Sequence, residues 1–101
     1  MRGWSLIQVK VHTILNLKKI LGRGDIDLTV KKGSTVTDVL NAMVETYGEP
    51  LSAQLFDSGG DLFPYIRLMV NGRDIAFLEN KMETALQDSD EILILPPVGG
   101  G

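Results

Sequence analysis

The residues best suited to chemistry are the last six of the sequence, Pro96-Pro97-Val98-Gly99-Gly100-Gly101. Consecutive prolines have no amide hydrogen for a sheet and favour an extended, semi-rigid backbone that projects away from the folded body. The glycines that follow carry no side chains, so this segment is narrow enough to pass through a tight channel. We expect it to deliver the carboxylate of Gly101 to a buried site. The alternative is a frayed terminus without a role, because glycine runs are common at chain ends.

Side chains elsewhere offer little further chemistry. His12 is the only histidine and there is no cysteine, which excludes disulfides, thiolate metal sites and a catalytic cysteine. No Ser-His-Asp set can be completed. The carboxylates of Asp57, Asp61, Asp88 and Asp90 lack the spacing of an EF-hand loop. We therefore expect no metal site and no bound cofactor.

Composition limits the classes of protein and partner. The chain has 101 residues, of which 44% are hydrophobic, enough for one domain with a core. We expect that domain over residues 1–98 and a tail over residues 99–101. A net charge of −3 argues against a nucleic-acid partner, since a basic patch usually supplies that affinity. No apolar run approaches the ~20 residues that span a membrane, so we expect a cytoplasmic protein without a membrane partner.

The element that must position the tail is a strand predicted over residues 91–95, because Pro96 ends it. Its sequence Ile92-Leu93-Ile94-Leu95 is apolar without alternation. Such a strand is central and covered on both sides, or presents one face to a partner. Strands are also predicted over residues 6–14 and 25–31, where apolar and polar residues alternate, which is typical of a sheet with one covered face.

One helix is clearly predicted in the middle of the chain. Thr35 is placed to be its N-cap, with Asp38 in a capping-box position. An apolar stripe follows at helical spacing, formed by Val36, Val39, Leu40, Met43, Val44 and Tyr47. Gly48 is placed to end this helix, and Pro50 to block its continuation.

The other segments are less strongly patterned. Residues 15–24 form a connection with a short helical turn. Residues 49–65 are hard to interpret, although their apolar residues Leu51, Leu55 and Phe56 are spaced for a short second helix. A strand is predicted around residues 66–70, a two-residue turn at Asn71-Gly72, and a return strand over residues 74–77.

This order of elements predicts an α+β fold. A β-grasp arrangement satisfies it: a mixed sheet of about five strands, crossed by one main helix, with the last strand beside the first. A flexible C-terminal tail would leave from the end of that last strand.

Several segments resemble one family. The C-terminal segment Asp90–Gly101 resembles the C-terminus of MoaD, the small subunit of molybdopterin synthase, in the MoaD/ThiS family of ubiquitin-like sulfur carriers. Val9-Lys10-Val11 and Leu17–Gly22 match the first strand and following turn of that family without a gap. Gly33–Leu40 resembles its helix entry, and Val70-Asn71-Gly72 its central turn.

The resemblance implies a carrier mechanism with Gly101 as the reacting residue. A MoeB-like enzyme would use ATP to convert the Gly101 carboxylate to an acyl-adenylate, from which a sulfide equivalent displaces AMP to leave a thiocarboxylate. A larger MoaE-like synthase subunit would receive this tail and pass the sulfur to a pterin precursor of the molybdenum or tungsten cofactor. The passing segment would comprise Pro96, Pro97, Val98, Gly99 and Gly100. Catalytic groups are expected on these partners, so the chain itself is not expected to be an enzyme.

The same resemblance suggests a partner-binding surface near the tail. Ile14, Ile94 and Leu95 lie at positions that resemble the family's apolar contact surface. Ordinary burial in the core is the alternative for each of these side chains, and the sequence leaves both open.

Other functions fit the same tail. Related carriers supply sulfur for the thiazole of thiamine, or for thiolation of other small molecules or tRNA. A ubiquitin-like modifier would instead join Gly101 to lysines of other proteins through an isopeptide bond. Both chemistries begin with adenylation, so the sequence does not separate them. A plain interaction domain with an inert tail is the third possibility. The Pro-Pro-Val leader and the gapless first-strand match favour the molybdopterin carrier.

Overall fold

The computed structural model describes residues 5–97. Residues 1–4 and 98–101 lie outside this part, and with them the expectations for Val98, Gly99, Gly100 and Gly101. The elements are β1 (Leu6–Thr13), α1 (Leu15–Leu21), β2 (Asp25–Lys31), α2 (Val36–Tyr47), α3 (Glu49–Leu55), β3 (Arg67–Val70), β4 (Arg73–Asp74), the 3₁₀ turns η1 (Ile75–Phe77) and η2 (Lys81–Glu83), and β5 (Glu91–Leu95).

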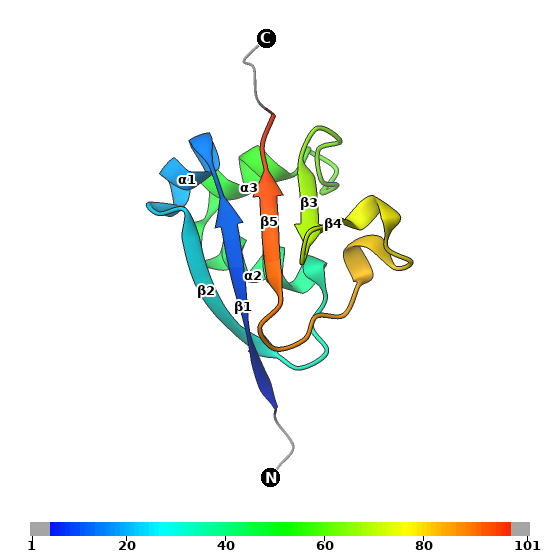
Figure 1. Cartoon of the computed structure of the whole chain (residues 1–101). Coiled ribbons are helices and arrows are strands. Elements are labelled where there is room, and N and C mark those ends of the chain that lie inside the picture. The colour runs from blue at the N-terminus through cyan, green and yellow to red at the C-terminus, as the bar shows by residue number, and fades with distance from the viewer. Residues whose placement is uncertain (1–4, 98–101) are drawn as a thin grey trace.

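Five strands form one mixed sheet in the order β2-β1-β5-β3-β4. Strands β1 and β2 form an antiparallel hairpin, β5 runs parallel to β1, and β3 runs antiparallel to β5. Figure 1 views the sheet from its open face, with the helices behind it. The last strand therefore lies beside the first, and the predicted β-grasp arrangement is confirmed.

Helix α2 follows the prediction at both ends. The hydroxyl of Thr35 accepts the amide hydrogen of Asp38 at 3.2 Å, and the Asp38 carboxylate accepts that of Thr35 at 2.9 Å, which forms the capping box. Gly48 ends the helix with a φ of 75°. Pro50 does not stop helical structure beyond that point, because it lies in the first turn of α3, where its missing amide hydrogen is not needed.

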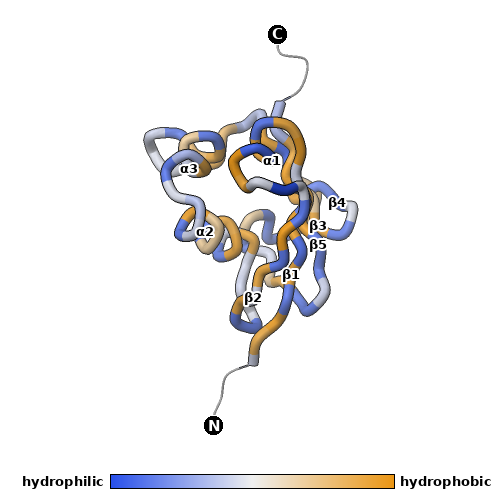
Figure 2. The backbone as a smooth tube through the Cα atoms, turned by 90° about the vertical axis from the view of Figure 1, so that its left-hand side faces the viewer, coloured by the Kyte–Doolittle hydropathy of each residue, from blue (hydrophilic) through white to orange (hydrophobic). Residues whose placement is uncertain are grey.

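The core lies between the helices and one face of the sheet. Figure 2 shows this layering from the side, with α2 and α3 on one side of the strands. In β1 every second residue is buried, which places Ile7, Val9 and Val11 against the helices. In β5 the buried residues are Ile92 and Ile94. The central position predicted for the last strand is confirmed, but only one of its faces is fully covered.

Residues 49–65 contain the short second helix that the spacing of their apolar residues predicted. Leu51 and Leu55 of α3 are buried, and Phe56 is half-buried at its C-cap. In the turn that follows, one carboxylate oxygen of Asp57 accepts the amide hydrogens of Gly59 and Asp61 at 2.9 and 3.1 Å. This segment therefore packs on the helical side of the sheet.

Three local predictions were wrong in extent. The first strand ends at Thr13 rather than at residue 14, because Ile14 becomes the N-cap of α1. The connection after it holds a seven-residue helix rather than a single turn. The return strand over residues 74–77 is confined to Arg73–Asp74. A 3₁₀ turn replaces the rest, because the Asp74 carboxylate accepts the amide hydrogen of Ala76 at 2.9 Å.

The core predicts a difference between two identical substitutions. Leu40→Ala removes a fully buried side chain, so the free energy of unfolding should fall by about 2–5 kcal/mol. Leu6→Ala removes the same atoms from a side chain that is 63% exposed, and should change that free energy by less than about 0.5 kcal/mol. Urea unfolding monitored by circular dichroism measures both. Equal losses would contradict the placement of the core.

Candidate functional site

The site lies where β5 ends and the chain leaves the sheet. At this end Ile94 lies opposite Thr13 of β1, and Leu95 lies opposite Arg67 of β3. Strands β1 and β5 end together at the top of Figure 1. Pro96, the next residue, is buried, and Pro97 is exposed. The point at which the tail segment emerges is therefore held by strands on both sides.

Exposed apolar side chains flank this point on both sides. Ile14, which follows the end of β1, is 40% exposed, and Leu15 is 51% exposed. On the other side Tyr65, two residues before Arg67, is 51% exposed. Its ring stacks on that of Phe63 with centroids 5.0 Å apart. Large exposed apolar residues that gather in one place are typical of a protein contact surface.

An apolar stripe continues from this end across the open face of the sheet. Leu93 and Leu95 are half-buried and point away from the helices, since they alternate with the buried residues of β5. Met69 of β3 lies opposite Leu93 and is also half-buried. We call Ile14, Leu15, Tyr65, Met69, Leu93 and Leu95 the tail-base surface.

Charged side chains on the open face are paired within the molecule. His12 contacts Asp25 of β2 through Nδ1 at 2.6 Å and Glu91 of β5 through Nε2 at 2.8 Å. It thereby links three neighbouring strands. On the other side of the stripe the Arg67 guanidinium donates to the Asp74 carboxylate at 2.9 Å. The tail-base surface is thus bordered by charges that already have partners.

These pairs shift the proton affinities of their members. The hydrogen bond with Asp25, and then that with Glu91, raises the pKa of His12 above its ordinary value. The hydrogen bond with His12 lowers the pKa of the Asp25 carboxyl. The pKa of Asp74 is lowered first by the amide hydrogen of Ala76 and then by the pairing with Arg67 (the residue opposite Leu95).

The structure separates the three residues expected to bind a partner. Ile14 is exposed and Leu95 is half-buried, and both belong to the tail-base surface. Ile94 is 1% exposed, so its side chain is part of the core, the alternative that the sequence left open. Pro96 and Pro97 lie at the start of the tail, whereas Val98 and the three glycines lie outside the described residues.

Comparison with known proteins identifies the family. The model of the ThiS family matches residues 15–101. The chain belongs to the ThiS family. Its relatives there are ubiquitin-like sulfur carriers and protein modifiers. Small archaeal modifier protein 3 of Haloferax volcanii is 30% identical over 95 residues, which cover 94% of this ThiS-family chain and 100% of that protein.

Solved structures agree with the observed fold. The solution structure of small archaeal modifier protein 1 from Methanosarcina acetivorans has a TM-score of 0.79 at 36% identity, and covers 96% of this chain and 99% of that chain. A chain in the crystal structure of the BexX/CysO complex of Amycolatopsis orientalis has a TM-score of 0.74 at 26% identity, with 92% and 99% covered. The ThiS-family chain therefore has the ubiquitin-like β-grasp fold.

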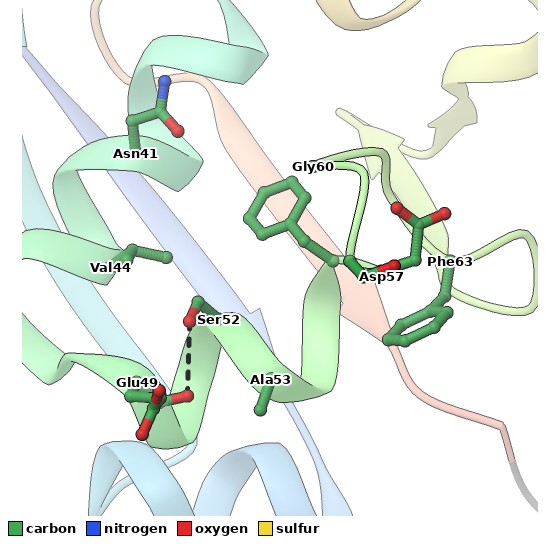
Figure 3. Close-up of a pocket in the computed structure, with 10 residues that line it drawn as sticks. Asn41, Val44, Glu49, Ser52, Ala53, Asp57, Gly60 and Phe63 are labelled. Carbon is green, nitrogen blue, oxygen red and sulfur yellow. Dashed lines mark hydrogen bonds between the residues drawn. The ribbon is translucent and has the colours of Figure 1, made fainter.

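A separate groove lies on the helical side, between α2, α3 and the turn after α3 (Figure 3). It has a volume of about 780 Å³, and its apolar lining includes Val44, Phe56 and Phe63. Its acidic residues are Glu49, which is exposed, and Asp57, which is engaged in the turn. Within residues 5–97 no group of three or more His, Cys, Asp or Glu side chains could hold a metal ion. Over the same residues no helix is long and apolar enough to cross a bilayer.

Sequence patterns missed Leu15 and Tyr65 as members of the surface. Both are apolar residues next to a strand end, and nothing in their spacing distinguishes them from core residues. One signal was present at Tyr65, because Phe63-Pro64-Tyr65 places two aromatic rings beside a proline. At Leu15 the only sign is structural: its φ of 58° is unusual for leucine and arises from the sharp exit from β1 into α1.

The His12 cluster predicts how stability depends on pH. The pKa of His12 is raised on folding. Its hydrogen bonds therefore stabilise the folded state fully at pH values below the ordinary histidine pKa of 6.5, and this stabilisation is lost as pH rises through the raised pKa. The pKa of Asp25 is lowered on folding. Its stabilisation of the folded state is therefore present at pH values above the ordinary aspartate pKa of 3.8, and is lost as pH falls through the lowered pKa. Between these limits the cluster should be fully stabilising.

We therefore expect the melting temperature of the wild type to exceed that of His12→Gln most clearly near pH 5.5, with a difference that shrinks steadily toward about pH 8. Thermal melts at several pH values, followed by circular dichroism, measure this difference. A gap that stays constant or widens toward pH 8 would show that the cluster does not act through a protonated histidine.

Proposed function

We propose that this chain carries sulfur as a thiocarboxylate on Gly101, after activation of that carboxylate by a partner enzyme. The observation that supports this most is the placement of Pro96 and Pro97 directly after the central strand, next to Leu95 of the tail-base surface. That arrangement gives a narrow glycine segment a fixed origin and gives a partner a surface to bind. Residues 99–101 supply the reactive end.

The proposed chemistry needs two steps on the same carboxyl group. In the first, the carboxylate attacks the α-phosphorus of ATP, and pyrophosphate leaves as the acyl-adenylate forms. In the second, a sulfide equivalent attacks the acyl carbon and AMP leaves, which gives the thiocarboxylate. A free carboxylate is a poor acyl donor because its leaving group would be oxide, and adenylation removes that barrier. The catalytic groups are expected on partner proteins, with a MoeB-like enzyme performing the adenylation, so the chain acts as a carrier rather than an enzyme.

We propose molybdopterin synthesis as the destination of the sulfur. Support comes from the Pro96-Pro97-Val98 leader and from the gapless resemblance of the first strand to the molybdopterin carriers. A MoaE-like subunit would then take up the tail, and a pterin precursor of the molybdenum or tungsten cofactor would accept the sulfur in the cytoplasm. A related solved structure is that of a complex of two proteins, which supports a partner-dependent role.

A second function is favoured by a specific observation. A relative that is 30% identical and aligns over its whole length is named a small archaeal modifier protein. A modifier would use the same adenylate but transfer the Gly101 carbonyl to a lysine of another protein. Isolation of a peptide in which Gly101 is linked to a lysine side chain would favour this function over the sulfur carrier.

The direct test is the intact mass of the protein after incubation with ATP, a sulfur donor and a MoeB-like enzyme. The carrier predicts a gain equal to the difference between one sulfur and one oxygen atom, located in the C-terminal peptide. No gain with an enzyme that activates other carriers would contradict the proposal and favour an inert tail or a different activator.

The tail itself predicts an effect of bulk at one position. Gly100→Trp should reduce thiocarboxylate formation to below about one hundredth of the wild-type rate, because the ring prevents the carboxylate from reaching the reaction geometry. Gly59→Trp adds the same side chain to the exposed turn after α3 and is the matched control. Mass spectrometry over time measures the rate. Equal rates for Gly100→Trp and the wild type would exclude passage through a narrow channel.

The tail-base surface predicts an effect on binding. Ile14→Asp places a charge on this surface, and KM for the carrier in adenylation should rise at least about tenfold. The change does not threaten the fold, because Ile14 is an N-cap without a side-chain hydrogen bond and aspartate is preferred there. Leu6→Asp is the control, since Leu6 is exposed at the other end of β1. The surface is excluded from the interface if both variants give the wild-type KM.

A further inference from the structure

Among residues 5–97, Thr13 is the only polar residue that is buried, with 3% of its surface exposed. It is the last residue of β1 and lies opposite Ile94. Burial of a hydroxyl group is unfavourable unless the group is hydrogen-bonded. The Thr13 hydroxyl meets this condition by donating to the backbone carbonyl of Ile94 at 2.9 Å.

This hydrogen bond lies where the backbone ladder between β1 and β5 stops. Their register ends at the Thr13–Ile94 pair, because Ile14 leaves the sheet to cap α1. Leu15, next in the chain, adopts a φ of 58°, which completes the turn away from β5. The amide of Thr13 is used on the other side, where it donates to the carbonyl of Gly24 at 2.8 Å. Thr13 thus connects β5 to the start of β2 through two different groups.

The two residues that follow Leu95 cannot donate hydrogen bonds to the ladder. Pro96 and Pro97 have no amide hydrogen, and their fixed φ makes the segment semi-rigid. The orientation of the peptide group between Ile94 and Leu95 therefore sets the direction in which this segment leaves the sheet. The Thr13 hydroxyl holds the carbonyl of that peptide group.

We infer that Thr13 is a positioning residue for the activation of Gly101, because its hydroxyl fixes the Ile94 carbonyl and with it the exit direction of the Pro96-Pro97 segment. The inference rests on the proposed function for its kinetic consequence. In this role Thr13 is not a catalytic residue. It acts through Ile94, so its loss should affect the rate of reaction in the bound complex rather than the binding surface.

The key variant is Thr13→Val, which keeps the shape of the side chain and removes the donor. Thr13→Ser keeps the donor and removes a methyl group. The matched control is Thr46→Val, because the Thr46 hydroxyl also donates to a backbone carbonyl, that of Ala42 at 3.3 Å, on the exposed part of α2. Any effect of losing a threonine hydroxyl in general should appear in the control.

The first measurement is ATP–pyrophosphate exchange catalysed by a MoeB-like enzyme at varied carrier concentration. Thr13→Val should lower kcat about tenfold while KM for the carrier changes by less than about twofold, since a small misplacement of the reacting group is costly. Thr13→Ser should recover most of the wild-type kcat, and Thr46→Val should retain it. A wild-type kcat in Thr13→Val would overturn the inference. An equal loss of kcat in Thr13→Val and Thr13→Ser would overturn it as well.

The second measurement needs no enzyme. Amide hydrogen exchange by NMR should be at least about tenfold faster at Leu95 in Thr13→Val than in the wild type, with no change at Leu40 of α2. Unchanged exchange at Leu95 would show that the hydroxyl does not order the end of β5. If the wild type itself fails to support pyrophosphate exchange, the proposed function fails, whereas the exchange rate at Leu95 still decides whether Thr13 orders this strand end.

Discussion

Strand β5 is bound along both edges, in parallel to β1 and antiparallel to β3. On one of its faces the side chains of Ile92 and Ile94 pack against the helices, and these two residues are 0% and 1% exposed. A tail that began at an edge strand would shift with every local opening of that edge. The segment that starts at Pro96 instead leaves from the middle strand of the sheet. The rest of the fold, from the hairpin to α2, can be understood as the support for this strand.

The difference between the two faces of the sheet follows from the same strand. Its helical face takes the buried isoleucines, so Leu93 and Leu95 must lie on the open face. There the surrounding charges, such as those of His12 and Arg67, are satisfied within the molecule. A partner therefore does not have to compensate an isolated charge when it covers the stripe. Binding can be driven by apolar contact, and specificity by the shape around the end of β5.

Much of the fold was predictable because its signals are local. The capping box at Thr35, the Asn71-Gly72 turn with φ of 50° and 85°, and the alternation along β1 and β2 each depend on a few neighbouring residues. The site was predictable only in part, since exposure depends on distant elements. Ile94 and Leu95 have the same apolar character, yet only the register of β5 decides which is buried. Thr13 gave no sequence signal, because a threonine in a strand is ordinary until its burial is known.

The two edges of the sheet limit how copies of this protein meet. Strand β4 has only two residues, which is too short to template another strand. The outer strand β2 carries the exposed residues Asp25, Asp27 and Lys31, and charges along an edge oppose strand addition. Both features therefore oppose the edge-to-edge pairing of copies into fibrils, even at high concentration. For the carrier proposed above, the absence of such pairing would leave each copy available to its partners.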